Sequence, residues 1–173
     1  MSFSQPLFPE LGLPDGIDEA GRSTGILPSQ QIRCLIEKRH LTASLDFETD
    51  QLQPASIDLR LGPVAYRARA SFLPNRASVR GRLEDLDSHP IDLTRPAVFE
   101  RGGVYIVPLL ESVSLPDQFW AKANPKSTTG RLDILTRLIT DFGKQFDYVP
   151  IGYKGQLYLE VAPQTFSVMV TQG

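Results

Sequence analysis

Apolar and polar residues alternate along several short segments, and this pattern predicts a mainly β protein. In QLYLEV, residues 156–161, one face of a strand carries the apolar side chains and the other carries Gln156, Tyr158 and Glu160. Runs of similar character, bounded by Pro and Gly, occupy residues 56–61, 103–110, 134–140 and 166–171. Strands of this length and spacing predict a β-barrel or a β-sandwich.

Two segments have a helical period instead. A helix is predicted from Ser29, which can cap its first turn, to about His40, because three apolar residues then share one face: Ile32, Leu35 and Ile36. The charged sequence RASVRGRLEDLDS, residues 76–88, predicts a surface helix or insertion. The expected domain is therefore mainly β, with an N-terminal helix and one short helical insertion.

The first 25 residues are rich in Gly, Pro and Ser without a sustained period, and we expect them to form an irregular arm. Residues 26–173 are expected to form one domain. The whole chain has 173 residues, 41% of them hydrophobic, which is enough to bury a core without metals or disulfides.

Charge and composition narrow the range of partners. The 18 Lys and Arg residues are balanced by 20 Asp and Glu residues, so the chain lacks the net positive charge typical of proteins that bind long nucleic acids. This charge balance is compatible with a small anionic ligand. No apolar run approaches the roughly 20 residues that cross a bilayer, and the start of the chain lacks a signal-peptide pattern. We therefore expect a cytoplasmic protein that binds neither membranes nor polymeric nucleic acid.

Side chains suited to chemistry gather in two places. The turn PKSTTGRLD, residues 125–133, brings together two cations, Lys126 and Arg131, and two hydroxyls, Ser127 and Thr128, which suits phosphate oxygens. An ordinary polar turn is the alternative interpretation. Glu160 lies on the polar face of its strand, where a solvent-exposed glutamate is the alternative. Composition and spacing alone favour the alternative in both places.

Three stretches, taken together and in this order, resemble motifs of the dCTP deaminase family in the dUTPase-like superfamily: QPASIDLRLG (53–62), ESVSLPDQFWAKANPKSTTGRLD (111–133) and GYKGQLYLEV (152–161). The resemblance runs from about Ile26 to the C-terminus. It implies a distorted β-barrel that assembles as a homotrimer or a trimer-like assembly with sites between subunits. The implied reaction is hydrolytic deamination of dCTP to dUTP and ammonia, in pyrimidine deoxynucleotide biosynthesis.

The resemblance also implies catalytic roles. Glu160 would activate the water that attacks C4 of cytosine, and Arg131 and Ser127 would lie beside that water. A zinc deaminase needs a histidine or cysteine followed by a Cys-x-x-Cys pair, which a single cysteine, Cys34, cannot supply. We therefore expect deamination without zinc.

Further residues would bind the nucleotide, whether dCTP, dUTP or dTTP. The resemblance implies that Lys126, Ser127 and Thr128 hold the triphosphate, with Mg²⁺ bound to the triphosphate and not in a protein cage. Thr140 falls where the family uses a backbone carbonyl near the base. Tyr153 would contact the sugar or the base through its backbone or ring.

Two departures from the family pattern leave other activities open. Pro150 stands where related enzymes carry an aspartate facing the sugar, and Asp147 is the candidate substitute. The chain also ends at Gly173, soon after a predicted strand, which predicts a truncated chain or the first half of a tandem form. The alternatives are a bifunctional enzyme that also cleaves dUTP, a dUTPase, and a nucleotide-binding module without turnover. Because dUTPases activate water with an aspartate in the position of Pro150, the sequence favours the deaminase.

Overall fold

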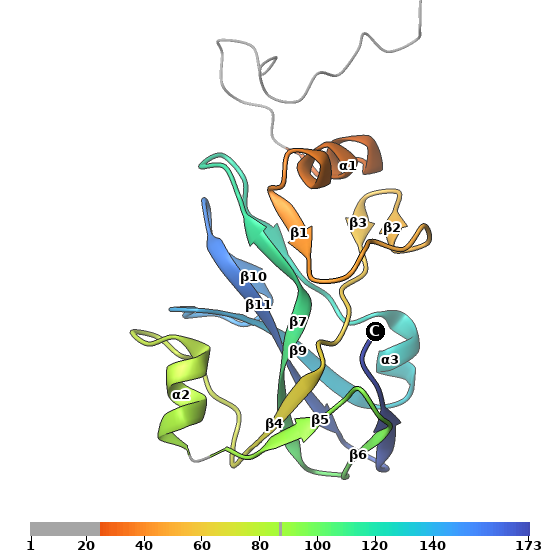
Figure 1. Cartoon of the computed structure of the whole chain (residues 1–173), viewed down its shortest axis with the longest axis vertical. Helices are drawn as coiled ribbons and strands as arrows, with labels where there is room; N and C mark the ends of the chain where they lie inside the picture. The colour runs from red at the N-terminus through yellow and green to blue at the C-terminus, as the bar shows by residue number, and fades with distance from the viewer. Residues whose placement is uncertain (1–24, 87) are drawn as a thin grey trace, which may run out of the picture.

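The computed structural model describes residues 25–86 and 88–173, and most of their regular structure is β (Figure 1). Within these residues the helices are α1 (Ser29–Glu37), α2 (Val79–Asp85) and α3 (Ser127–Arg131). The strands are β1 (Leu41–Ala43), β2 (Leu52–Gln53), β3 (Ser56–Ile57), β4 (Val64–Ala68), β5 (Pro90–Asp92), β6 (Ala97–Phe99), β7 (Val104–Ser114), β8 (Ala121–Lys122), β9 (Ile134–Thr140), β10 (Tyr148–Val149), β11 (Lys154–Pro163) and β12 (Val168–Val170). The predicted mainly β fold with an N-terminal helix and a helical insertion is confirmed. The arm predicted over residues 1–25 lies outside the described residues except for Gly25.

Two long strands, β7 and β11, form the centre of the structure (Figure 1). Strand β11 pairs antiparallel with β7 on one side and with β9 on the other, within a six-stranded sheet of order β5-β4-β7-β11-β9 to which β1 is added along β7. The remaining strands pair as β2–β3, β6–β12 and β8–β10. Among the described residues these pairings do not close into a ring, so the expected barrel is open and irregular.

The register of the central strands places four side chains in one row across the sheet. Tyr66 of β4 lies opposite Ile106 of β7, and Ile106 lies opposite Glu160 of β11. Glu160 in turn lies opposite Arg137 of β9. Residues that are directly opposite in an antiparallel pair project from the same face, so this row belongs to one side of the sheet.

Both faces of the sheet are covered near its centre. On one face Val161 belongs to a buried cluster with Tyr105. On the other face α2 contributes Val79 and Leu83 to a buried cluster with Tyr158. The predicted surface helix is therefore a helix with one buried side, and it covers the face that was expected to be polar.

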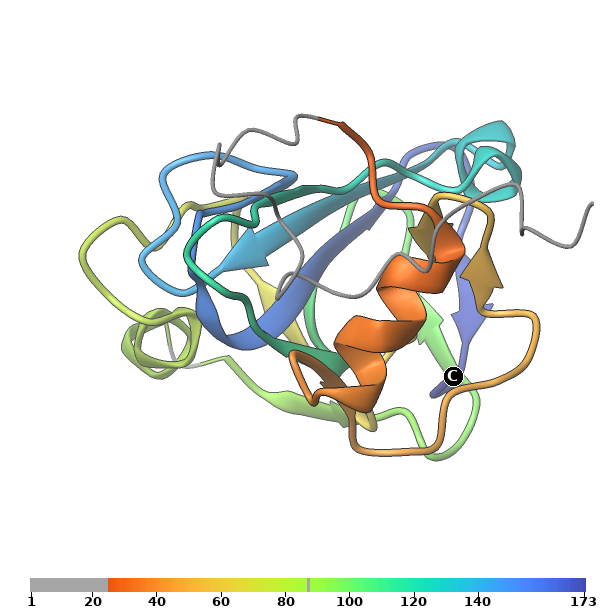
Figure 2. The same cartoon turned by 90° about the horizontal axis from the view of Figure 1, so that it is seen from above.

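Helix α1 lies at one end of the molecule, near β1 and β3, and crosses over the strands when seen from that end (Figures 1 and 2). Its predicted apolar face is confirmed, because Ile32 and Leu35 are buried. The predicted cap is wrong. Pro28 is the N-cap residue, in an extended conformation, and Ser29 is the first residue of the helix with no side-chain cap. The helix begins one residue earlier than expected because the carbonyl of Pro28 already accepts the first N–H groups of the helix.

The longer predicted strands are confirmed as β7, β9 and β11, and the short run 166–171 is reduced to β12. The run 56–61 is mostly wrong, because only β3 and an isolated bridge between Leu61 and Leu109 belong to the β pairing. Between them, the backbone N–H of Arg60 bonds to a buried carboxylate on β7, and only its carbonyl pairs with the β7 backbone, by accepting the N–H of Leu110.

Candidate active site

Glu160 lies in the middle of β11, directly opposite Arg137 of β9. Its side chain is only 1% exposed. Its Oε1 accepts two N–H groups of Arg137, from Nε at 3.0 Å and from Nη2 at 2.5 Å. Its other oxygen, Oε2, is buried and has no hydrogen-bond partner among the described residues. The interpretation of Glu160 as a solvent-exposed strand residue is therefore wrong, because packing by α2 and adjoining segments covers this face.

Arg137 is in turn held by two segments outside the strands. Its Nη2 donates a hydrogen bond to Oγ of Ser71 at 2.8 Å, and its guanidinium carbon lies 4.0 Å from the centroid of the Phe146 ring. Ser71 lies between β4 and α2, and Phe146 lies between β9 and β10. Arg137 was not among the predicted site residues. The available signal was its place in ILTRLIT, residues 134–140, where one charge interrupts an otherwise uncharged strand.

A second glutamate, Glu111 of β7, is equally buried but fully bonded. Its Oε1 accepts hydrogen bonds from Nε2 of Gln51 at 2.8 Å and from Nε of Arg60 at 2.9 Å. Its Oε2 accepts the backbone N–H of Arg60 at 2.9 Å. This closed network ties the QPASIDLRLG stretch to β7, and it leaves no polar atom of Glu111 for a ligand.

The predicted phosphate turn forms α3 and the residue before it. Ser127, Thr128 and Arg131 are exposed, and their side chains have no hydrogen bond or ion pair within the part of the chain that the structure describes. Lys126 is exposed too, and its Nζ lies 2.5 Å from Oδ2 of Asp58. The hydrogen bond and charge of Asp58 raise the pKa of the Lys126 ammonium, so this cation stays charged at neutral pH. The turn is thus a solvent-facing group of hydroxyls and cations.

Glu160 and the turn do not meet within one chain. The bonds of the described residues include none between Glu160 and Ser127 or Arg131. Glu160 is three residues along β11 from Pro163, which lies opposite Ile134 at the start of β9, just after the turn. At roughly 3.3 Å per strand residue, this end of the sheet is about 10 Å from Glu160.

Thr140 and Tyr153 lie where the far end of β9 meets the segment that follows it. Thr140 is completely buried at the end of β9, and its carbonyl accepts the N–H of Gly143 at 3.0 Å. The hydroxyl of Tyr153 donates to the carbonyl of Gln156 at 2.8 Å and accepts the N–H of Asp141 at 3.1 Å. Burial raises the pKa of Tyr153 to about 12. The phenol hydroxyl therefore bonds to backbone. The main-chain N–H of Tyr153 donates to the carbonyl of Pro150 and its carbonyl accepts the N–H of Leu115, which leaves the ring as the group for a ligand.

Asp147, the candidate substitute for the aspartate missing at Pro150, has a structural partner. Its Oδ1 accepts the backbone N–H of Leu138 at 2.7 Å, and its own backbone has a positive φ of 59°. A carboxylate that holds a strand N–H stabilises the segment between β9 and β10. The structure therefore gives Asp147 a role in shaping this segment.

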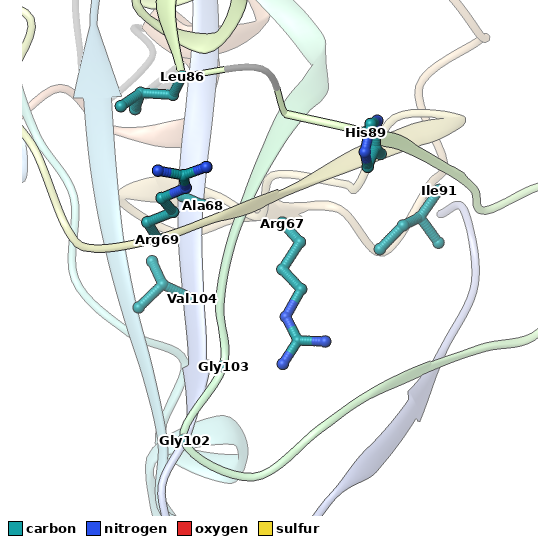
Figure 3. Close-up of a pocket in the computed structure, with 9 residues that line it drawn as sticks. All are labelled: Arg67, Ala68, Arg69, Leu86, His89, Ile91, Gly102, Gly103 and Val104. Carbon is teal, nitrogen blue, oxygen red and sulfur yellow. The ribbon is translucent and has the colours of Figure 1, made fainter.

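A hollow of about 590 Å³ lies elsewhere, where β4 meets the start of β7 (Figure 3). Arg67, Arg69 and His89 line it, together with the Gly102–Gly103 turn, and Figure 3 shows the two arginines pointing in different directions. Arg67 forms an exposed ion pair with Glu100. None of the predicted site residues lines this hollow, so it is distinct from the candidate active site.

Residues 25–86 and 88–173 contain no group of three or more His, Cys, Asp and Glu side chains placed to hold a metal ion. They also contain no helix that combines the length and the apolar character needed to span a membrane.

Comparisons with known proteins place these motifs in a family. The model of the 2'-deoxycytidine 5'-triphosphate deaminase N-terminal domain matches residues 23–173. A Dictyoglomus turgidum protein named "dCTP deaminase, dUMP-forming" is 30% identical over 146 residues, which cover 79% of this chain and 69% of the relative. A Haloarcula marismortui protein named "dCTP deaminase" is 30% identical over 126 residues, which cover 68% of this chain and 58% of the relative.

A solved structure agrees in both sequence and fold. The crystal structure of 2'-deoxycytidine 5'-triphosphate deaminase from Agrobacterium tumefaciens matches with 52% identity and a TM-score of 0.85, over 88% of this chain. The match covers 46% of that protein's chain, so the present chain spans just under half of its length. On the family match, the relatives and the shared fold, this chain belongs to the dCTP deaminase family.

Proposed function

We propose that this protein catalyses the hydrolytic deamination of dCTP to dUTP and ammonia, with Glu160 as the catalytic carboxylate. Family membership supports the reaction. The observation that carries the assignment is Oε2 of Glu160, a buried carboxylate oxygen without a partner among the described residues, whereas both oxygens of Glu111 are bonded. Buried polar atoms are nearly always hydrogen-bonded, so an unpaired one marks a position that a ligand or water completes.

The chemistry assigned to Glu160 follows from that oxygen. Water adds to C4 of cytosine while Oε2 takes one of its protons, and that proton is delivered to N3 of the ring. The proton left on the added hydroxyl then passes through Glu160 to the amino nitrogen. The bond between C4 and that nitrogen breaks, ammonia leaves, and C4 keeps the water oxygen as a carbonyl. One water is consumed per dCTP, and no electrons are exchanged. Arg131 and Ser127 are proposed to steady the charge that develops on the attacking water.

Lys126, Ser127 and Thr128 are proposed to hold the triphosphate of the substrate, which carries its own Mg²⁺. An ammonium and two hydroxyls are the donors that phosphate oxygens require, and all three side chains are exposed. Lys126 is paired with Asp58 in the free protein, so the triphosphate would compete with that carboxylate for the ammonium. We expect Thr140 and Tyr153 to contribute main-chain or ring contacts to the nucleoside.

We further propose a homotrimer or trimer-like assembly with the site between subunits. Glu160 and the phosphate turn lie at separated positions of one chain, and the polar side chains of the turn face solvent. A neighbouring copy that brings its turn to Glu160 would complete the site, and closed symmetry would repeat this contact around the oligomer.

A bifunctional enzyme is the second candidate, and the names of two relatives favour it. The proteins from Dictyoglomus turgidum and Dictyoglomus thermophilum are both named "dCTP deaminase, dUMP-forming". In that case a second water would cleave dUTP to dUMP and pyrophosphate after ammonia has left.

Product analysis separates these functions. The purified full-length protein would be incubated with dCTP and Mg²⁺, ammonia measured, and the nucleotides resolved by chromatography. Ammonia with dUTP supports the deaminase, and ammonia with dUMP and pyrophosphate supports the bifunctional enzyme. Binding of dCTP without ammonia release would contradict both and favour a nucleotide-binding module. We also propose that turnover is independent of zinc. If a zinc-selective chelator abolished ammonia release and zinc alone restored it, this proposal would be contradicted.

A further inference from the structure

The two N–H groups that Arg137 donates to Glu160 converge on a single oxygen. Nε and Nη2 both bond to Oε1, at 3.0 and 2.5 Å. A bidentate pair between a guanidinium and a carboxylate instead uses one donor for each oxygen. As a result the carboxylate is anchored through Oε1, while Oε2, although buried, has no hydrogen-bond partner among the described residues.

Arg137 has little freedom to leave this position. Its Nη2 also bonds to Ser71 at 2.8 Å, and the ring of Phe146 lies against the guanidinium at 4.0 Å. The β9–β11 pairing fixes its backbone opposite Glu160. The backbone, a hydroxyl and an aromatic ring therefore restrain one guanidinium, and its charge offsets the cost of burying the carboxylate.

We propose that Arg137 is a positioning residue, which holds Glu160 by Oε1 so that Oε2 is presented to the reacting water. The inference rests on the proposed function of Glu160, and it assigns Arg137 no contact with the nucleotide. A purely structural ion pair would instead contribute to folding and leave the turnover of each folded molecule unchanged. Turnover and substrate affinity therefore distinguish the two roles.

The primary test compares Arg137→Gln and Arg137→Lys with the wild-type protein, measuring kcat and KM for dCTP. We expect Arg137→Gln to lower kcat by about 10²-fold, the effect typical of a reacting group displaced by about 1 Å, with KM nearly unchanged. Lysine keeps the charge but not the planar pair of donors, so it should restore only part of kcat. Arg80→Gln is the matched control, because Arg80 forms an exposed pair with Glu84 on α2, and its kcat should equal that of the wild type.

A double-mutant cycle shows whether Arg137 acts through Glu160. Once Glu160 is replaced by Gln, adding Arg137→Gln should cost no more than about 3-fold, because the carboxylate to be positioned is gone. Losses that multiply in the double variant would overturn the inference. An Arg137→Gln protein with raised KM and unchanged kcat would overturn it too, since Arg137 would then bind the nucleotide.

Two further measurements keep the test decisive. If circular dichroism shows that Arg137→Gln does not fold, two other variants replace it. Ser71→Ala removes the hydroxyl that accepts from Nη2 of Arg137, and Phe146→Leu removes the ring that packs on its guanidinium. Each should lower kcat several-fold without raising KM, and unchanged kcat in both would overturn the inference. A crystal structure of Arg137→Gln gives a readout without turnover: a Glu160 carboxylate still in its wild-type position would overturn it. A wild-type protein that releases no ammonia from dCTP would contradict the proposed function instead.

Discussion

Glu111 and Glu160 are buried to nearly the same degree, 0% and 1% exposed, and they differ in what their oxygens contact. A buried carboxylate is tolerated where a cation and hydrogen bonds compensate for lost hydration. Glu111 has such partners on both oxygens, from Arg60 and Gln51, whereas Glu160 has them on one. The first arrangement is complete without a ligand and serves stability. The second is incomplete and fits a reacting group.

The stability role of Glu111 gives a first prediction. Glu111→Gln removes the buried charge that faces Arg60, which is 8% exposed, and leaves its guanidinium with only the exposed carboxylate of Glu48, at 3.5 Å, as counter-charge. We expect the free energy of unfolding to fall by about 3 to 5 kcal/mol, measured by denaturant unfolding. Glu100→Gln is the control, because its pair with Arg67 is exposed on both sides and should contribute no more than about 1 kcal/mol. Equal effects of the two substitutions would contradict the structural assignment.

The catalytic role of Glu160 gives a second prediction. Glu160→Gln keeps nearly the same volume but removes the group that accepts a proton from water, so turnover of dCTP should fall by about 10² to 10⁴. Arg137 is 28% exposed, so its charge keeps some hydration and the protein should stay folded and bind dCTP. Steady-state kinetics, calorimetric titration with dCTP and circular dichroism measure these three properties. A folded variant that turns over dCTP at the wild-type rate would disprove the assignment.

The sequence directed attention to Glu160 but not to Arg137, for physical reasons. Glu160 was singled out by the family motifs on an alternating strand, and its catalytic role stays a prediction. Its burial depends on α2, a helix distant in sequence. Arg137 was missed because its significance lies in the register between β9 and β11, which no local pattern encodes. The positions proposed for Lys126, Ser127 and Arg131 stay predictions about the bound state.

At the scale of elements, α2 is fixed over the sheet by polar bonds at its first turn. Ser78 caps the helix, with its Oγ accepting the N–H of Gly81 at 3.0 Å. Asp141, just after β9, accepts the N–H of Val79 at 2.7 Å through Oδ1. Because β9 carries Arg137, this bond connects the covering helix to the strand of the candidate site.

Asp141→Ala tests that connection. Removing the carboxylate leaves the N–H of the fully buried Val79 without an acceptor, so we expect a loss of about 1 to 3 kcal/mol in the free energy of unfolding. Hydrogen exchange should become faster throughout α2, residues 79–85. Arg80→Gln, on the exposed side of the same helix, serves as the control and should leave exchange unchanged. Unchanged exchange in both variants would show that apolar packing alone fixes α2.

Element length explains which parts of the fold the sequence could predict. Strands β7, β9 and β11 have 11, 7 and 10 residues, long enough to carry an apolar pattern. Strands of two or three residues, such as β1, β5 and β8, exist through their pairing partners and have no period of their own. In residues 56–61 the bonds that Arg60 donates to the Glu111 carboxylate, one from its backbone N–H and one from its side chain, interrupt the local β pattern.

At the scale of the whole molecule, the candidate site is divided. Glu160 lies buried on the central strand β11 and pairs with Arg137 on the edge strand β9, while α3 presents its hydroxyls and arginine to solvent at the sheet's end. A nucleotide that engages both Glu160 and the turn must therefore bridge groups that one chain holds apart, or else contact two chains. The proposed trimer corresponds to the second case.

Mixing two inactive variants tests this division of the site. We expect Glu160→Gln and Arg131→Ala to be inactive separately, because each lacks one group that the reaction needs. If a site takes Glu160 from one subunit and Arg131 from its neighbour, randomly mixed trimers contain intact sites in about a quarter of positions, and ammonia release should return to about that fraction of wild type. If both groups came from the same subunit, no intact site could form and the mixture would stay inactive. Sedimentation would establish that the mixed species are trimers, and a fully active wild-type monomer would contradict the shared site.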